Sequence, residues 1–331
     1  MMKAGGNPNG RPNSDVIYPY INASDLTTGT RNTWIIDFKR LPENSAAQFA
    51  QPFEHVEKFV KPEREKTGEL DAIKTWWIHW RTRPEMSELL EPLPRFLATP
   101  RVSKHRVFVW LTPPTYPDNA VIAYARGDDY FFGVLHSRFH EVWALALGTQ
   151  LREKESGFRY TPTTCFETFP FPRQTPAQET AIASAAKDLN EQRERWLNPP
   201  EWTVETILEF PGSADGPWAR YIVPSSIINP PSSLGLVRYP RLEPRDADCA
   251  AKLKKRTLTN LYNERPTWLA NAHKKLDAAV VAAYGWPADL TDEQILEKLL
   301  ALNLERAAEE AQAAKVNKPK TSREKHAEAR I

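Results

Sequence analysis

The stretch from Thr161 to Pro172, TPTTCFETFPFP, separates two parts of the chain with different patterns. It is too irregular for either a helix or a strand. Thr175 and Pro176 then match the start of a helix, with a hydroxyl cap and proline at the first helical position. This pattern predicts a long helix from Pro176 to Leu197. We therefore expect an α+β fold: a mixed α/β domain before this junction and a mainly helical region after it.

Short apolar runs alternate with turn residues before the junction. Three of these runs predict buried strands, at Thr33–Phe38, Val107–Leu111 and Ala120–Ala125. Helices are predicted at Ser45–Val60 and Leu70–Trp80, between the first two strands.

Two further apolar runs follow the third predicted strand. Asp128 and Asp129 form a predicted turn that leads into the run Tyr130–Leu135. From Leu135 to Leu147 apolar residues recur with a helical period, and Gly148 is the expected end of that helix.

The chain after the junction divides into a linker, helices and a tail. Residues 198–248 are rich in proline, serine and glycine and predict a linker-like wrap. Helices are predicted at 246–262 and 266–284, and a capping box at Thr291–Gln294 starts another. The expected organisation is a loop or truncated end at 1–11, a mixed domain at 12–172, a helical region at 173–314, and a disordered charged tail at 315–331.

The composition excludes several classes of protein. The 331 residues are 41% hydrophobic and 26% charged with a net charge of +2, as in an ordinary globular chain. No apolar run approaches the ~18 residues of a membrane span, and no signal peptide is visible, so we expect a cytoplasmic protein without a membrane partner. The two cysteines, Cys165 and Cys249, are too few for a disulfide scaffold. No glycine-rich phosphate loop or nucleophile elbow is present.

Two motifs resemble functional sites without completing them. His136 and His140 have the spacing of a helical metal pair, but Ser137 stands where a zinc protease needs glutamate. We interpret them as one packed and one surface histidine and expect no metal site. Asn-Pro-Pro occurs at Asn198 and Asn229, yet Glu201 and Ser232 replace the aromatic residue that an amino-group methyltransferase stacks on its target base. Both tripeptides are interpreted as turns.

Positive charge gathers in two regions. Residues 74–106 contain seven Lys or Arg interleaved with tryptophans, which is the composition of a phosphate-tracking surface. A solvated helix surface is the alternative for both regions. The expected contacts with the DNA backbone in the first region are Arg81, Arg83, Lys104, His105 and Arg106. The second region contains Arg238, Arg241, Arg245, Lys252, Lys254, Lys255 and Arg256.

Four segments carry a family resemblance. They contain Gly10–Asn22 leading to Trp34–Phe38; Trp76-Trp77 and Arg101–Arg106; Phe132–Trp143 with Arg159-Tyr160-Thr161 and Phe166–Pro172; and Arg256–Asn263 through Tyr284–Pro287. In this order they resemble the C-terminal half of MmeI-like class I adenine-specific DNA methyltransferases of restriction–modification and phage-defence systems.

The resemblance implies a target-recognition domain followed by a helical C-terminal region. The family's methyltransferase core, with its S-adenosylmethionine loop, lies N-terminal to these segments. It implies N6-adenine methylation for the whole enzyme, while no catalytic residue transfers to this chain. The expected partners are double-stranded DNA and a methyltransferase core chain in trans, which would hold S-adenosylmethionine. A stand-alone DNA-binding remnant and a protein-interaction module remain alternatives.

The family's base-reading positions resemble residues 150–158, just before Arg159-Tyr160. Glutamate accepts a hydrogen bond from cytosine N4, and arginine or lysine donates to guanine O6 and N7. Glu155 is therefore the candidate base reader, with Arg152 and Lys154 beside it, and a solvated loop of mixed charge is the alternative. Arg159 is assigned to a phosphate contact or a structural anchor.

Overall fold

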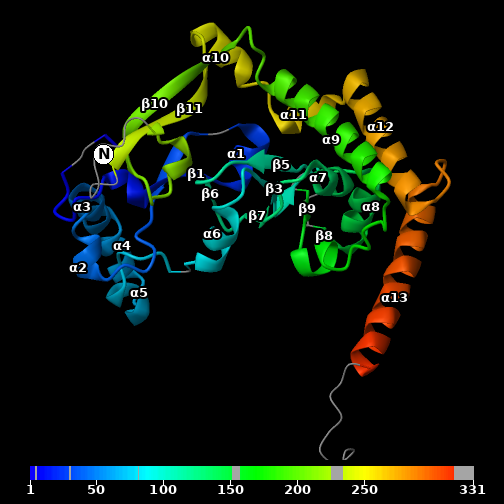
Figure 1. Ribbon diagram of the computed structural model, residues 1–331, viewed down its shortest axis with the longest axis horizontal. Coiled ribbons are helices and arrows are strands. Elements are labelled where there is room, and N and C mark those ends of the chain that lie inside the picture. The colour runs from blue at the N-terminus through cyan, green and yellow to red at the C-terminus, as the bar shows by residue number, and fades with distance from the viewer. Residues whose placement is uncertain (4–5, 30, 81, 151–156, 225–233, 317–331) are drawn as a thin grey trace, which may run out of the picture.

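The computed structural model describes the chain except residues 4–5, 30, 81, 151–156, 225–233 and 317–331. The described part forms an arch (Figure 1). Short N-terminal helices lie at one end, small sheets in the middle, and packed helices at the other end, from which the last helix projects. This architecture confirms the predicted α+β fold.

The N-terminal part combines a small sheet with short helices. Strand β1 (Ile17–Ile21) pairs antiparallel with β2 (Thr33–Ile36) and parallel with β6 (Tyr116–Pro117). The other elements are η1 (Asn13–Val16), α1 (Ala23–Thr28), α2 (Glu43–Ala46), α3 (Ala50–Phe59), α4 (Lys61–Lys66), α5 (Leu70–Lys74) and α6 (Pro84–Leu90).

The two helices predicted in this part are shorter than expected. The first is divided into α2 and α3, and the second ends at Lys74. Tertiary packing overrides the helical pattern here. The Trp76 ring lies 5.1 Å from Phe53, and the Trp77 indole N–H donates to the Leu41 carbonyl over 2.9 Å.

Two three-stranded sheets form the middle of the arch. In the first, β3 (Phe96–Pro100) is fully buried between β5 (Val109–Leu111) and β7 (Val121–Tyr124), both antiparallel to it. The second has the order β4-β9-β8. Its strands are β4 (Val102–Ser103), β9 (Phe158–Arg159) and β8 (Thr149–Gln150). The predicted strands at 33–38, 107–111 and 120–125 are confirmed as β2, β5 and β7, each slightly shorter.

The apolar run after Asp128 forms a helix, α7 (Asp129–Leu135). Asp128 is its N-cap and accepts a hydrogen bond from the Phe131 amide over 2.8 Å. Next comes α8 (Arg138–Leu147), which ends at Gly148 as predicted. The aspartate pair therefore starts a helix that packs against α9.

Most helices of this layer follow the prediction, but the one predicted at 246–262 is divided in two. The junction itself contains one π-helical turn, η3 (Pro162–Phe166), where no regular element was expected. Helix α9 (Pro176–Leu197) has the predicted bounds, and Thr175 and Gln178 form its capping box. The remaining helices are α10 (Ala247–Leu253), α11 (Leu258–Glu264), α12 (Thr267–Tyr284), which ends at Gly285, and α13 (Asp292–Val316), which begins at the predicted Thr291–Gln294 capping box.

The segment expected to be linker-like instead contains two long strands. Strands β10 (Thr203–Ser213) and β11 (Leu234–Pro244) pair antiparallel along their whole length. Between them η4 (Ala219–Tyr221) follows the buried Trp218. The proline and glycine residues that suggested a linker are accommodated because the sheet has only two strands, so neither strand is central in a larger sheet.

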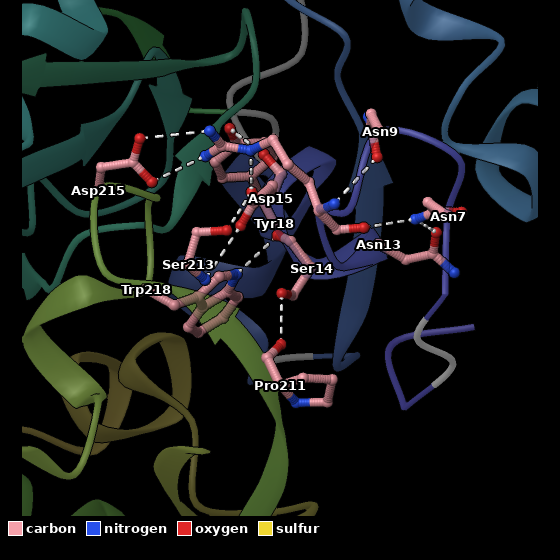
Figure 2. A network of polar contacts seen from close by, with 11 residues as sticks. Asn7, Asn9, Asn13, Ser14, Asp15, Tyr18, Pro211, Ser213, Asp215 and Trp218 are labelled. Atoms are coloured by element: carbon pink, nitrogen blue, oxygen red, sulfur yellow. Dashed lines mark hydrogen bonds and ion pairs between the residues drawn. The ribbon is translucent and has the colours of Figure 1, made fainter. Parts of the chain in front are cut away.

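The strand pair returns to the first residues of the chain (Figure 2). The Trp218 indole N–H donates to the carbonyls of Ser14 and Ile17, over 2.9 and 3.2 Å. The Ser213 hydroxyl donates to Asp15 over 2.6 Å. Residues 13–15 are consequently buried.

Candidate nucleic-acid interface

The β4-β9-β8 sheet brings two of the sequence-predicted regions together. In the pairing of β4 with β9, Val102 faces Arg159 and Ser103 faces Phe158. Strand β8 ends at Gln150, and β9 begins at Phe158. The segment that contains Arg152, Lys154 and Glu155 therefore starts and ends on this sheet, although these three residues lie outside the described residues.

Gly157 fixes where that segment returns to the sheet. Its φ is +82°, in the left-handed region. A Cβ atom at this position would stand 2.1 Å from the Ser103 carbonyl oxygen and 2.6 Å from the Lys104 amide nitrogen. Only glycine allows this approach without strain. The end of the predicted base-reading loop is thus placed directly against Lys104.

Lys104 and His105 are held from the helical layer. The Lys104 Nζ donates to Asn263 Oδ1 over 2.8 Å, and His105 Nε2 lies 2.9 Å from the same oxygen. The His105 ring also lies 5.9 Å from that of Tyr262. Lys104 is exposed and His105 is half-buried, so both remain near the surface. The sequence patterns did not identify Asn263, because nothing local to α11 shows that its side chain meets β4.

Arg106 has a different place from the one expected. It is buried, and its guanidinium lies 4.7 Å from the Phe158 ring and 4.8 Å from the Tyr160 ring. One guanidinium nitrogen donates to the Thr99 hydroxyl over 2.9 Å, and also to the Pro100 carbonyl. Burial lowers the pKa of Arg106 to about 10. This is the environment of a structural cation inside the fold, and the guanidinium does not face a ligand outside it.

The remaining predicted cations lie apart from one another. Arg159 is exposed on β9, next to the predicted base-reading loop. Arg83 is the exposed N-cap of α6, a helix that contacts β6 through Ser87 and Tyr116. Arg81 lies outside the described residues. Lys104, His105 and Arg159 therefore form one group on the β4-β9-β8 sheet, and Arg83 is on a separate element.

A cavity of about 260 Å³ opens beside Lys104. Ser24 and Thr27 of α1, Ser103 and Thr259 contribute hydroxyl groups to its wall. All four hydroxyls have protein acceptors. Ser103 donates to the His105 carbonyl over 2.7 Å, for example. The hydroxyl oxygens of the wall can therefore act only as acceptors toward a ligand, and Lys104 and His105 line the cavity beside apolar residues.

His136, the C-cap of α7, and His140 of α8 are both buried, which corrects the expectation of one surface histidine. His136 belongs to a core network that joins four helices, whereas His140 Nε2 lies 2.9 Å from the Tyr160 hydroxyl. Arg193 of α9 donates to His136 Nε2 over 2.9 Å and to the Phe108 carbonyl over 2.8 Å. The Tyr262 hydroxyl lies 2.6 Å from the same His136 nitrogen and 3.0 Å from His273 Nε2.

These buried rings are kept neutral. Burial, and then the Arg193 charge, lower the pKa of His136 well below its usual value. The pKa of His273 falls to about 3 for the same two reasons, and burial brings that of His140 to about 3. No group of three or more His, Cys, Asp or Glu side chains in the described part of the chain is arranged to hold a metal ion.

None of the described helices is long and apolar enough to cross a bilayer.

Exposed cations on a small sheet that is braced by helices provide the chemistry of a phosphate-contacting surface. Residues 7–173, half of the chain, match the family model described as MmeI, target recognition domain, and the chain therefore belongs to this family.

A solved structure gives the same fold. The chain is similar to the Type IIL restriction-modification enzyme MmeI, determined in complex with DNA, with a TM-score of 0.60 and 17% sequence identity. The match covers 89% of this chain and 32% of that one, so the chain spans about a third of the length of this relative. Comparison with curated protein sequences gives no match.

Proposed function

We propose that this chain is the DNA target-recognition part of a site-specific adenine-N6 methyltransferase in a restriction–modification or phage-defence system. Membership of the MmeI target recognition domain family carries the proposal. The likeness in fold to an enzyme solved with DNA and the cationic β4-β9-β8 sheet support it. In this proposal residues 12–172 form the recognition domain and residues 173–314 the helical region that braces it.

Recognition combines two kinds of contact. Lys104 and Arg159 contact phosphates of duplex DNA and fix the position of the chain on it. The loop between β8 and β9 then enters the major groove, where Glu155 accepts from a cytosine amino group and Arg152 or Lys154 donates to guanine. This binding presents an adenine to be extruded from the duplex into the pocket of a methyltransferase core.

S-adenosylmethionine does not fit the described residues. Class I methyltransferases bind it at the carboxyl ends of parallel strands, beside a glycine-rich loop. The pairings between described strands are antiparallel except that of β1 with β6, and no glycine loop follows those two strands. We therefore derive no step through this cofactor and assign it to a methyltransferase core, carried by a partner chain or by another part of a longer protein.

Binding to a library of duplex sequences at several salt concentrations tests the proposal. The wild-type chain should prefer one sequence, and its affinity should fall steeply with salt. Glu155→Ala should relax the preference and leave the salt slope almost intact, whereas Lys104→Ala should weaken binding to all duplexes and reduce the slope by about 0.9. Lys187→Ala, an exposed site on α9, is the control. Absence of any preferred duplex refutes the recognition role, and an unchanged preference in Glu155→Ala refutes the assignment of the reading loop.

The methyltransferase partner is tested separately. The DNA upstream of the Met1 codon should encode a glycine-loop strand and an Asn-Pro-Pro-aromatic motif. Unrelated sequence there would contradict an adjacent core, and the chain would then be a stand-alone DNA-binding protein.

A further inference from the structure

The end of α10 and the turn that leads to α11 present an unusual concentration of positive charge. Lys252, Lys254, Lys255 and Arg256 place four cations within five residues. Within the described part of the chain none of them has a carboxylate oxygen within the 4.0 Å of an ion pair.

The structure thereby divides the second basic region of the sequence into two parts. Arg238 and Arg241 lie on β11 and pair with Glu209 and Glu243, over 3.0 and 3.2 Å. Their charges are largely neutralised by these partners. The nearest acidic residues along the chain from the turn are Asp246 and Asp248, at the other end of α10. The net positive charge of the region is therefore concentrated in the α10–α11 turn.

The backbone of the turn is well fixed. The amides of Lys255 and Arg256 donate to the carbonyls of Lys252 and Leu253, over 3.1 and 2.9 Å. Asn260 Nδ2 donates to the Lys255 carbonyl over 2.9 Å. A rigid turn of this kind holds the exposed Lys254 and Lys255 in place, and little backbone entropy is lost when they bind a ligand.

Aromatic packing adds to this order. The Arg256 guanidinium lies 4.4 Å from the Trp196 ring and 5.0 Å from the Trp202 ring, and the Lys252 ammonium lies 5.5 Å from Trp202. These two cations are engaged by the indoles. Lys254 and Lys255 are the ones left to contact a ligand.

Helix α11 links this turn to the candidate interface. The helix begins directly after the basic turn. Near its other end is Asn263, whose side chain contacts Lys104 and His105. Seven helical residues span about 10 Å, at roughly 1.5 Å for each residue. A DNA strand has one phosphate for about every 3.4 Å of axis, so the two cationic groups are separated by about three phosphates. Figure 1 shows α11 between α10 and the sheets in the middle of the arch.

We propose that Lys254 and Lys255 form a second phosphate-contacting site, on DNA that flanks the sequence read by the β8–β9 loop. The inference rests on the proposed function and extends DNA contact from the recognition domain to the helical region. The chemistry favours DNA over an acidic protein, since lysine is depleted in protein–protein interfaces but contributes directly to counterion release on DNA.

The salt dependence of DNA binding tests this site. The double variant K254A/K255A should lower the slope of log K against log salt by up to about 1.8, or 0.9 for each phosphate contact. Its preferred duplex should stay the same, because phosphate contacts carry no sequence information. K254R/K255R should keep the wild-type slope. K187A/K274A, which removes two exposed lysines from α9 and α12, is the matched control for net charge.

Each outcome separates the site from the proposed function. A wild-type slope in K254A/K255A overturns the second site while recognition stands, and the lysines are then left for an acidic protein or for solvent. An equal decrease in K187A/K274A also overturns it, because the effect is then one of total charge. A wild-type chain that binds no duplex refutes the proposed function itself, and the second site with it.

Discussion

The buried histidines predict a steep loss of stability in mild acid. A histidine in the unfolded chain has a pKa of about 6.5. The pKa values of His140 and His273 in the folded chain are about 3, and that of His136 is well below its usual value. Protonation therefore favours the unfolded state as the pH falls below about 6.5, and this effect continues until the folded rings titrate near pH 3.

The size of the effect follows from these pKa values. Between pH 7 and pH 5 His140 and His273 each lower the free energy of unfolding by about 2 kcal/mol, and together by about 4 kcal/mol. His136 acts in the same direction. Asp277 acts in the opposite direction. Burial raises the pKa of its carboxyl to about 6, so the folded state takes up a proton in the same range. This offsets about 1 kcal/mol, so the net loss expected from His140, His273 and Asp277 is about 3 kcal/mol.

Urea unfolding followed by tryptophan fluorescence at pH 7, 6 and 5 measures this loss. His140→Gln should reduce the difference in the free energy of unfolding between pH 7 and pH 5 by about 2 kcal/mol, because one titrating ring is removed. His55→Gln, at an exposed position of α3, should leave the difference unchanged. A wild-type difference below about 1 kcal/mol would refute the reasoning, since unprotonated native rings require a larger one.

Three further substitutions have defined outcomes. Asp15→Ala leaves the buried Ser213 hydroxyl without its acceptor and should destabilise the chain by about 2–3 kcal/mol in urea unfolding; a loss below about 0.5 kcal/mol would contradict the bond. Gly157→Ala should force the loop away from the Ser103 carbonyl and weaken binding to the preferred duplex more than to others; equal weakening in the library assay would argue against that contact. Arg106→Ala should lower the melting temperature and leave the salt slope of DNA binding unchanged; a flatter slope would show that its guanidinium reaches DNA.

The helical region was predicted well because its signals are local. Thr175 is the N-cap of α9 as predicted, Thr291 and Gln294 form the capping box that the sequence indicates, and α9 has the predicted bounds. Caps and apolar periodicity act within one or two turns, so they are visible in sequence. The run after Asp128 was harder, because six consecutive apolar residues suit a buried strand or a buried helix equally.

The site depends on contacts between distant residues, and sequence patterns record few of these. Lys104 was found as a cation near aromatic residues and Arg159 through the family resemblance, and the pairing of β4 with β9 brings their segments together. Arg106 has the same sequence signal but is buried, since charge patterns do not show which side of a strand faces the core. Asn263 was missed because its partner, Lys104, is 159 positions away.

The return of the β10–β11 pair to the first residues has a consequence for synthesis. Trp218 is 204 positions from Ser14, whose carbonyl accepts its indole N–H. At about 5–20 residues per second, a ribosome needs roughly 10–40 s to make the intervening chain. Through that interval Trp34, which packs against Trp218 at 6.0 Å, lacks its partner. The N-terminal sheet is therefore completed late in translation, and a transplanted recognition domain that ends at residue 173 would lack the segment that covers it.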